Sequence, residues 1–149
     1  MSCGGKILIL GYGNPLRGDD GFGCEVARRL AASVQDPRVE VRELHQLTPE
    51  LADPVSQAGH VIFIDAAREG EPGEIRRGAV EPAATGSFTH HMTPATLLAC
   101  SRELYGHAPA ATQFTAAGSA FGYATNLSEP SAAALPDLCR QVLSLLQEL

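Results

Sequence analysis

The chain has 149 residues, 44% of them apolar, a length that accommodates one hydrophobic core but not two, so we expect a single domain spanning residues 1–149. Its formal net charge of −6 comes without a basic stripe, which argues against a nucleic-acid surface. The longest apolar runs have about four residues, against the roughly 20 needed to span a bilayer, and no secretory signal is seen, so we expect a cytoplasmic protein without a membrane partner.

The first half of the chain alternates between strand and helix patterns. Residues 6–10 form an apolar run that predicts a buried strand, and from Asp20 to about residue 33 apolar residues recur at helical spacing. Residues 39–44 alternate between apolar and polar, as expected of an edge strand, and a short helix then reaches about residue 57. Residues 61–65 contain four consecutive apolar residues before Asp65, which predicts a central strand buried on both faces.

The second half continues the alternation after an irregular stretch. Residues 68–87 are rich in Gly, Pro and Glu and predict a hairpin-like or edge excursion. A helix is expected over residues 93–105, opened by Thr and Pro, followed by a last strand at residues 112–116 and a closing helix at about residues 131–148. This order predicts an α/β fold, a three-layer αβα sandwich with a mainly parallel twisted sheet of about five strands.

The glycine-rich segment at residues 11–23 lies at the strand-to-helix turn where such sheets build their sites. A dinucleotide fingerprint needs a third glycine where this chain has Leu16, and no Gly-Lys-Ser/Thr follows. The adjacent carboxylates of Asp19 and Asp20 would repel a phosphate, so the turn suits a cation better. The alternative is that Asp20 only caps the following helix.

Two further groups are expected at the same edge of the sheet. Asp65 ends the central strand, and the pair His90-His91 precedes a helix. Two carboxylates and one imidazole suit a borderline divalent ion such as nickel or zinc. The alternatives are that Asp65 caps a turn and that the histidines are solvated loop residues.

Other hydrolytic and redox apparatus is missing from the sequence. There is no Gly-x-Ser-x-Gly elbow, no His-Glu-x-x-His zinc helix and no Cys-x-x-Cys pair. Nothing places a base beside Cys24, so catalysis by a side-chain nucleophile is disfavoured and the cysteines are expected to be free thiols.

Three motifs in this order resemble the hydrogenase maturation endopeptidases: Gly11-Tyr12-Gly13-Asn14 through Asp19-Asp20-Gly21-Phe22-Gly23, then Phe63-Ile64-Asp65-Ala66, then Thr89-His90-His91 through Leu97-Leu98. The resemblance covers essentially the whole chain. It implies removal of a C-terminal extension from the precursor of the nickel-containing large subunit of [NiFe] hydrogenase, after nickel has been inserted.

The resemblance also implies site residues, with Asp20, Asp65 and His90 as catalytic residues and metal ligands. His91 is a departure from the family pattern, and the register to Leu97 and Leu98 favours His90. Nickel would be carried by the precursor, whereas zinc or cadmium can take the same site in vitro, and binding should weaken as the pH falls through the titration of histidine. The alternatives are a metal- or small-molecule-binding α/β module, or a related peptidase with a different protein substrate.

Overall fold

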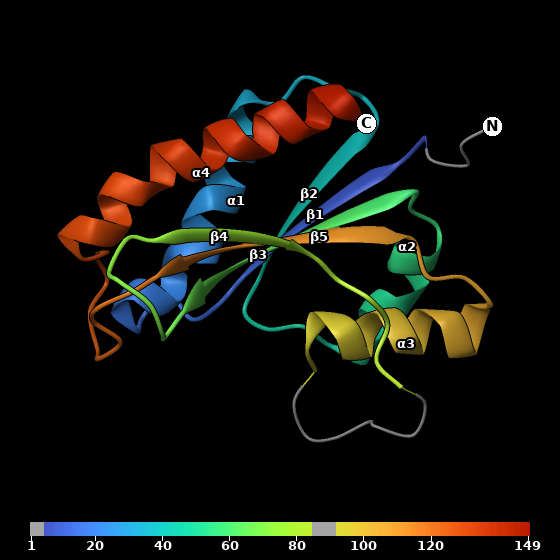
Figure 1. Cartoon of the computed structure of the whole chain (residues 1–149), viewed down its shortest axis with the longest axis horizontal. Coiled ribbons are helices and arrows are strands. Elements are labelled where there is room, and N and C mark those ends of the chain that lie inside the picture. Colours follow the sequence, from blue (N-terminus) through green and yellow to red (C-terminus); the bar gives the residue numbers. More distant parts are fainter. Residues whose placement is uncertain (1–4, 85–91) are drawn as a thin grey trace.

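The computed structural model describes residues 5–84 and 92–149, in which a twisted sheet lies between two layers of helices (Figure 1). The strands are β1 (Ile7–Tyr12), β2 (Val39–Leu44), β3 (His60–Ala67), β4 (Ile75–Ala79) and β5 (Ala110–Ala117). The α-helices are α1 (Phe22–Ser33), α2 (Ala52–Ser56), α3 (Pro94–Tyr105) and α4 (Glu129–Glu148), and short 3-10 helices, η1 (Gly18–Gly21) and η2 (Pro49–Leu51), precede α1 and α2.

The sheet has the order β2-β1-β3-β5-β4, so β3 is central and β2 is an edge strand, as predicted. The strands β2, β1, β3 and β5 are parallel, and β4 runs antiparallel to β5 at the other edge. This edge strand is the excursion expected in residues 68–87. The predicted α/β sandwich with a mainly parallel sheet is confirmed.

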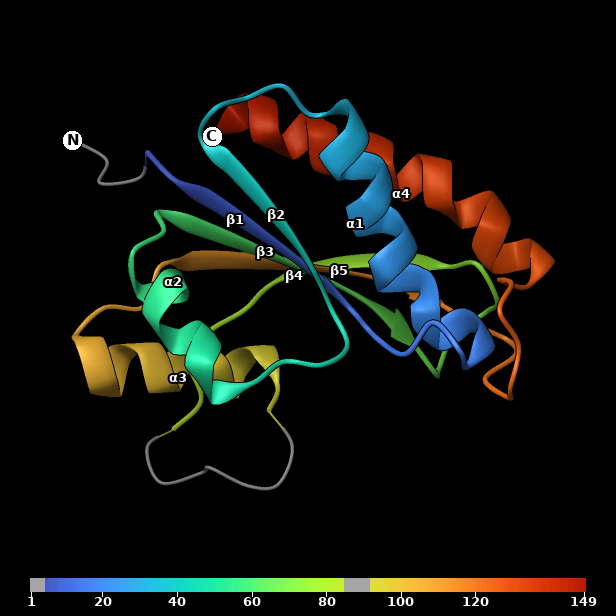
Figure 2. The ribbon, with the colours of Figure 1, turned by 180° about the vertical axis from the view of Figure 1, so that it is seen from behind.

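Each face of the sheet is buried by its own pair of helices, as the two opposite views show (Figures 1 and 2). Alternate residues of a strand point to opposite faces. One set, which includes Ile9, Ile62 and Phe114, packs with the apolar stripes of α1 and α4. The other set, which includes Leu10 and Phe63, packs with α2 and α3.

Several element bounds differ from the sequence prediction. The strand β3 continues two residues past Asp65, because Ala66 and Ala67 remain paired with β5. The α-helix after the glycine-rich turn begins at Phe22 rather than at Asp20, which lies in η1. Leu104 follows the buried Leu97 by seven positions and so continues the same apolar stripe, yet it is 66% exposed because it lies in the last turn of α3.

In the part of the chain that the structure describes, no helix is both long enough and apolar enough to span a bilayer.

Candidate functional site

The glycine-rich turn brings helix α1 unusually close to the sheet. A Cβ at Gly23 would lie within van der Waals overlap of the backbone oxygens of Ile64 and Tyr12, so only glycine allows the helix to start over β1 and β3. Gly13 has φ of 145°, and a Cβ there would collide with the carbonyl oxygen of Asp20. These glycines serve close backbone packing, which explains why the turn is glycine-rich without a phosphate-binding pattern.

Asp19 and Asp20 have different roles despite being adjacent. The Asp19 carboxylate is fully buried and accepts hydrogen bonds from the backbone N–H groups of Ser119 (2.8 Å), Ala120 (3.1 Å) and Ser128 (2.8 Å) and from the Ser128 hydroxyl (2.7 Å). Burial by itself raises the pKa of Asp19, but these hydrogen bonds outweigh it and hold the pKa below its usual value. Asp19 therefore anchors residues 118–128, which join β5 to α4, to the turn before α1.

Asp20 instead is half-buried and lies in η1. Its Oδ2 accepts a hydrogen bond of 2.9 Å from the backbone N–H of Asn14. The interpretation of Asp20 as the cap of α1 is wrong, because the residue preceding that helix is Gly21, and no side chain caps it. One carboxylate oxygen thus fixes the turn while the side chain borders the cleft described below.

Asp65 lies on β3, one position beyond the last pair of the β1–β3 ladder, Gly11 and Ile64. Its Oδ1 accepts a hydrogen bond of 2.7 Å from the N–H of Ala66. The pKa of Asp65 is raised to about 7, mainly by burial and in smaller part by the negative charge of Asp20, whereas the Ala66 hydrogen bond and the Arg68 cation act in the opposite direction. The two carboxylates are therefore close enough to interact electrostatically, although they come from different strands.

Asp20 and Asp65 line one cleft of about 940 Å³ at the carboxyl edge of the sheet. Figure 2 shows β1 and β3 ending at this edge, beside the beginning of α1. Besides the two acids, the cleft is lined by these residues: Tyr12, Gly13, Asn14, Arg17, His45, Gln46, Leu47, Thr48, Pro49, Arg68 and Met92. Two carboxylates in one concave, partly polar site are a suitable donor set for a divalent cation.

His90 and His91 lie outside the described residues, so the structure places neither of them. Their neighbour Met92 lines the cleft, and Thr93 caps α3 by accepting a hydrogen bond of 3.1 Å from the N–H of Thr96. Among residues 5–84 and 92–149, no three His, Cys, Asp or Glu side chains are grouped closely enough to hold a metal ion.

Four ionisable residues of the cleft were not predicted from the sequence: Tyr12, Arg17, His45 and Arg68. Tyr12 is the last residue of β1, and His45 directly follows β2. Their position at the carboxyl ends of parallel strands was the sequence signal that could have identified them. Arg17 was within the motif but was not singled out, and Arg68 follows Asp65 by three residues. Tyr12 is nearly buried, and both burial and the Asp65 charge raise its pKa, so its phenol stays protonated.

Cys24 lies near this region but does not act as a nucleophile there. Its Sγ contacts the carbonyl oxygens of Gly13 and Leu44, each at 3.3 Å. Burial, with a contribution from the Glu43 charge, raises the pKa of Cys24 to about 11, so the thiol is protonated at neutral pH. The described cysteines, Cys24, Cys100 and Cys139, are all free and buried, as predicted.

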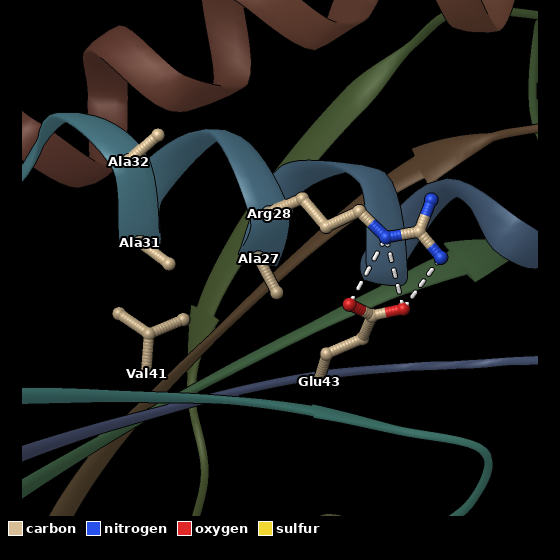
Figure 3. Close-up of a pocket in the computed structure, with 6 residues that line it drawn as sticks. All are labelled: Ala27, Arg28, Ala31, Ala32, Val41 and Glu43. Atoms are coloured by element: carbon tan, nitrogen blue, oxygen red, sulfur yellow. Dashed lines mark hydrogen bonds and ion pairs between the residues drawn. The ribbon is translucent and has the colours of Figure 1, made fainter.

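A second hollow, of about 500 Å³, lies between α1 and β2 (Figure 3). Its lining consists of small apolar side chains together with Arg28 and Glu43, which pair with each other. Because its charged groups satisfy one another, this hollow offers no reactive group for chemistry.

Comparison with solved structures gives matches over nearly the whole chain. A hydrogenase 2 maturation peptidase from Thaumarchaeota archaeon SCGC_AB-539-E09 is 26% identical, with a TM-score of 0.75 over 95% of this chain and 98% of its own. The hydrogenase maturating endopeptidase HybD from E. coli is 23% identical, with a TM-score of 0.80 over 96% and 93%. The [NiFe] hydrogenase maturation protease HycI from Thermococcus kodakarensis KOD1 is 25% identical, with a TM-score of 0.75 over 95% and 92%.

A scan against models of protein families and a search of curated proteins gave no match. The fold and the acid-lined cleft define an α/β protein with a candidate site at the carboxyl edge of its sheet. Its structural neighbours are hydrogenase maturation endopeptidases, and the chain has their fold. The resemblance inferred from the three sequence motifs is thereby confirmed.

Proposed function

We propose that the chain is an endopeptidase that removes the C-terminal extension from the nickel-loaded large-subunit precursor of a [NiFe] hydrogenase. The observation that carries the proposal is that Asp20 and Asp65, 45 positions apart in the sequence, line one cleft at the edge of the sheet where α/β proteins bind ligands. The likeness to solved maturation endopeptidases supports the same role.

In this proposal nickel arrives as part of the substrate. Asp20, Asp65 and His90 bind the ion, and their oxygen and nitrogen atoms fit a borderline divalent cation. When bound, such an ion polarises a carbonyl or makes hydroxide available near neutral pH, which removes the need for a side-chain nucleophile. A precursor without nickel lacks the group that the carboxylates recognise, which accounts for processing only after metal insertion.

The proposal is tested by incubating the purified protein with nickel-loaded and nickel-free large-subunit precursor and measuring the product masses. We expect a single cut that releases the C-terminal extension, and only from the loaded precursor. Cleavage of both forms at equal rates would contradict nickel recognition, and cleavage of neither would contradict the peptidase assignment.

The two adjacent histidines are expected to contribute very unequally. If the backbone of the two histidines is extended, their side chains point in opposite directions, and only one of them can then join Asp20 and Asp65. His90→Ala should therefore slow precursor cleavage far more than His91→Ala. His107→Ala is the matched control, because His107 is exposed and lies before the amino end of β5, at the opposite edge of the sheet. Equal or reversed losses at positions 90 and 91 would contradict the assignment.

Metal binding by the isolated protein is expected to be loose and reversible. The proposed site has two carboxylates and one imidazole but no thiolate, and thiolates are what make closed structural zinc sites tight. Calorimetric titration with nickel, zinc or cadmium should give weak binding that Asp20→Ala, Asp65→Ala and His90→Ala each remove. If the protein retains metal in the presence of a chelator, or if the three substitutions leave metal binding unchanged, the metal site is not formed by Asp20, Asp65 and His90.

A further inference from the structure

Two arginines border the same cleft as the acids. Arg17 immediately precedes η1, and Arg68 immediately follows β3. Both line the cleft together with Asp20 and Asp65, so the cleft carries cationic and anionic side chains.

Each guanidinium group lies over an aromatic ring of residues 118–128, here called the aromatic loop. The Arg68 guanidinium carbon is 4.2 Å from the centre of the Phe121 ring, and that of Arg17 is 5.2 Å from the centre of the Tyr123 ring. Both distances are within the range of a cation–π interaction, which holds the plane of the guanidinium group while leaving its edge N–H groups available.

The aromatic loop is itself fixed at several points. The Asp19 carboxylate holds it through Ser119, Ala120 and Ser128. Two backbone hydrogen bonds also hold Ala124 of this loop. Its carbonyl oxygen accepts from the Gly18 N–H at 2.9 Å, and its N–H donates to the Leu16 carbonyl at 3.1 Å. The rings under the two arginines therefore belong to an anchored surface.

Neither arginine forms a salt bridge in the described residues, although the Arg68 charge acts on Asp65 at longer range. No Asp or Glu oxygen lies within 4.0 Å of Arg17 or Arg68 in residues 5–84 and 92–149, and residues 1–4 and 85–91 contain no Asp or Glu. Several other arginines do form such pairs, namely Arg28, Arg38, Arg42, Arg76, Arg102 and Arg140. Among the described residues, Arg17 and Arg68 thus border the cleft without a salt-bridge partner.

We propose that Arg17 and Arg68 bind a carboxylate of the peptide substrate beside the cation site, so that the cleft recognises a metal ion and an acidic group together. The peptide nature of the ligand rests on the proposed function. A guanidinium edge matches a carboxylate with two parallel N–H···O hydrogen bonds. A dianionic phosphate fits less well, because Asp20 and Asp65 lie in the same cleft and repel the larger charge.

The experiment uses three short peptides as probes and needs no cleavage. Acetyl-Ala-Glu-Ala-amide carries a side-chain carboxylate, acetyl-Ala-Ala-Ala a terminal carboxylate, and acetyl-Ala-Gln-Ala-amide neither. Each is titrated into isotope-labelled protein while the Nε–H signals of the arginines are followed by nuclear magnetic resonance. We expect at least one of the two carboxylate peptides to shift the Arg17 and Arg68 signals, and the Gln peptide to leave them unchanged. The peptide that shifts these signals shows whether the site binds a side-chain carboxylate or a terminal carboxylate.

Arg77 provides a matched control, because it also lies over an aromatic ring, that of Phe114 at 5.6 Å, but does not line the cleft. Arg68→Ala and Arg17→Ala should each weaken binding of the active peptide by about tenfold, the scale of one charge-assisted hydrogen bond. Arg77→Ala should bind as the unchanged protein does, and Arg68→Lys, which keeps the charge but loses the planar edge, should be intermediate.

Equal shifts with the Gln peptide, shifts at Arg77 as large as those at Arg17 and Arg68, or no shift with any peptide would overturn the proposal. The titration of the unchanged protein decides the matter even where a variant fails to fold. Peptide binding without precursor cleavage would contradict the proposed peptidase function and leave the arginine site standing.

Discussion

Asp20→Ala and Asp65→Ala are each expected to reduce processing of the nickel-loaded precursor by at least about 100-fold. Loss of a group that only supports a metal ligand typically costs 10- to 100-fold, and these two carboxylates are proposed to contact the ion directly. Product mass measured over time gives the rates for the two variants and the unchanged protein. Full processing by either folded variant would contradict the proposed site.

The fold should survive both changes, because neither side chain belongs to the apolar core. Asp20→Ala loses one hydrogen bond, from Asn14, and removes no helix cap. Asp137→Ala on α4 is the matched control, since it removes an exposed carboxylate that does not line the cleft. That variant should process the precursor at the unchanged rate, and circular dichroism should show native folding in all three.

Asp19→Ala is expected to have the largest effect on stability, lowering the free energy of unfolding by about 3–5 kcal/mol. The substitution leaves three backbone N–H groups and the Ser128 hydroxyl without their buried acceptor, and each unsatisfied buried group costs roughly 1–3 kcal/mol unless water reaches it. Urea unfolding at neutral pH measures the loss. Asp36→Ala, which removes a partly exposed partner of Arg38, should cost much less.

The Asp19 contribution should also depend on pH. Because its pKa is lower in the folded protein than in the unfolded chain, the stabilisation is fully present above the unfolded value of about 3.9 and is lost as the pH falls through the folded value. Asp19→Asn, which presents an amide to the same donors, should be less stable than the unchanged protein at pH 7. The difference should shrink in acid, and a constant difference down to pH 2 would contradict this assignment.

The strands and helices were largely predictable, because local patterns determine them. The apolar run at residues 61–64 and the alternation at residues 39–44 correctly gave a central and an edge strand. The start of α1 was placed two residues early, since an acid before an apolar stripe is a common helix cap, whereas here a 3-10 turn intervenes. Leu104 fitted the helical pattern yet lies exposed, because a short helix end need not cover the sheet.

The candidate site was predictable only in part. That Asp20 and Asp65 share a cleft follows from the rule that parallel strands end at one edge. The separate role of Asp19 could not be predicted, because its partners Ser119, Ala120 and Ser128 lie about 100 positions away and three of the four donors are backbone N–H groups, which carry no residue signature. The Arg68–Phe121 contact depends on the same loop conformation, and no pattern in the sequence announces it.

The anchoring of the aromatic loop by Asp19 has a consequence for how the molecule is assembled. The hydrogen bonds from Ser119 and Ser128 to Asp19 join positions 100 and 109 residues apart. Contacts of such long range form late, because the entropy of closing the intervening chain must be overcome before they are made. During synthesis the turn that carries Asp19 and Asp20 therefore lacks its anchor to the aromatic loop until the chain has grown past residue 128.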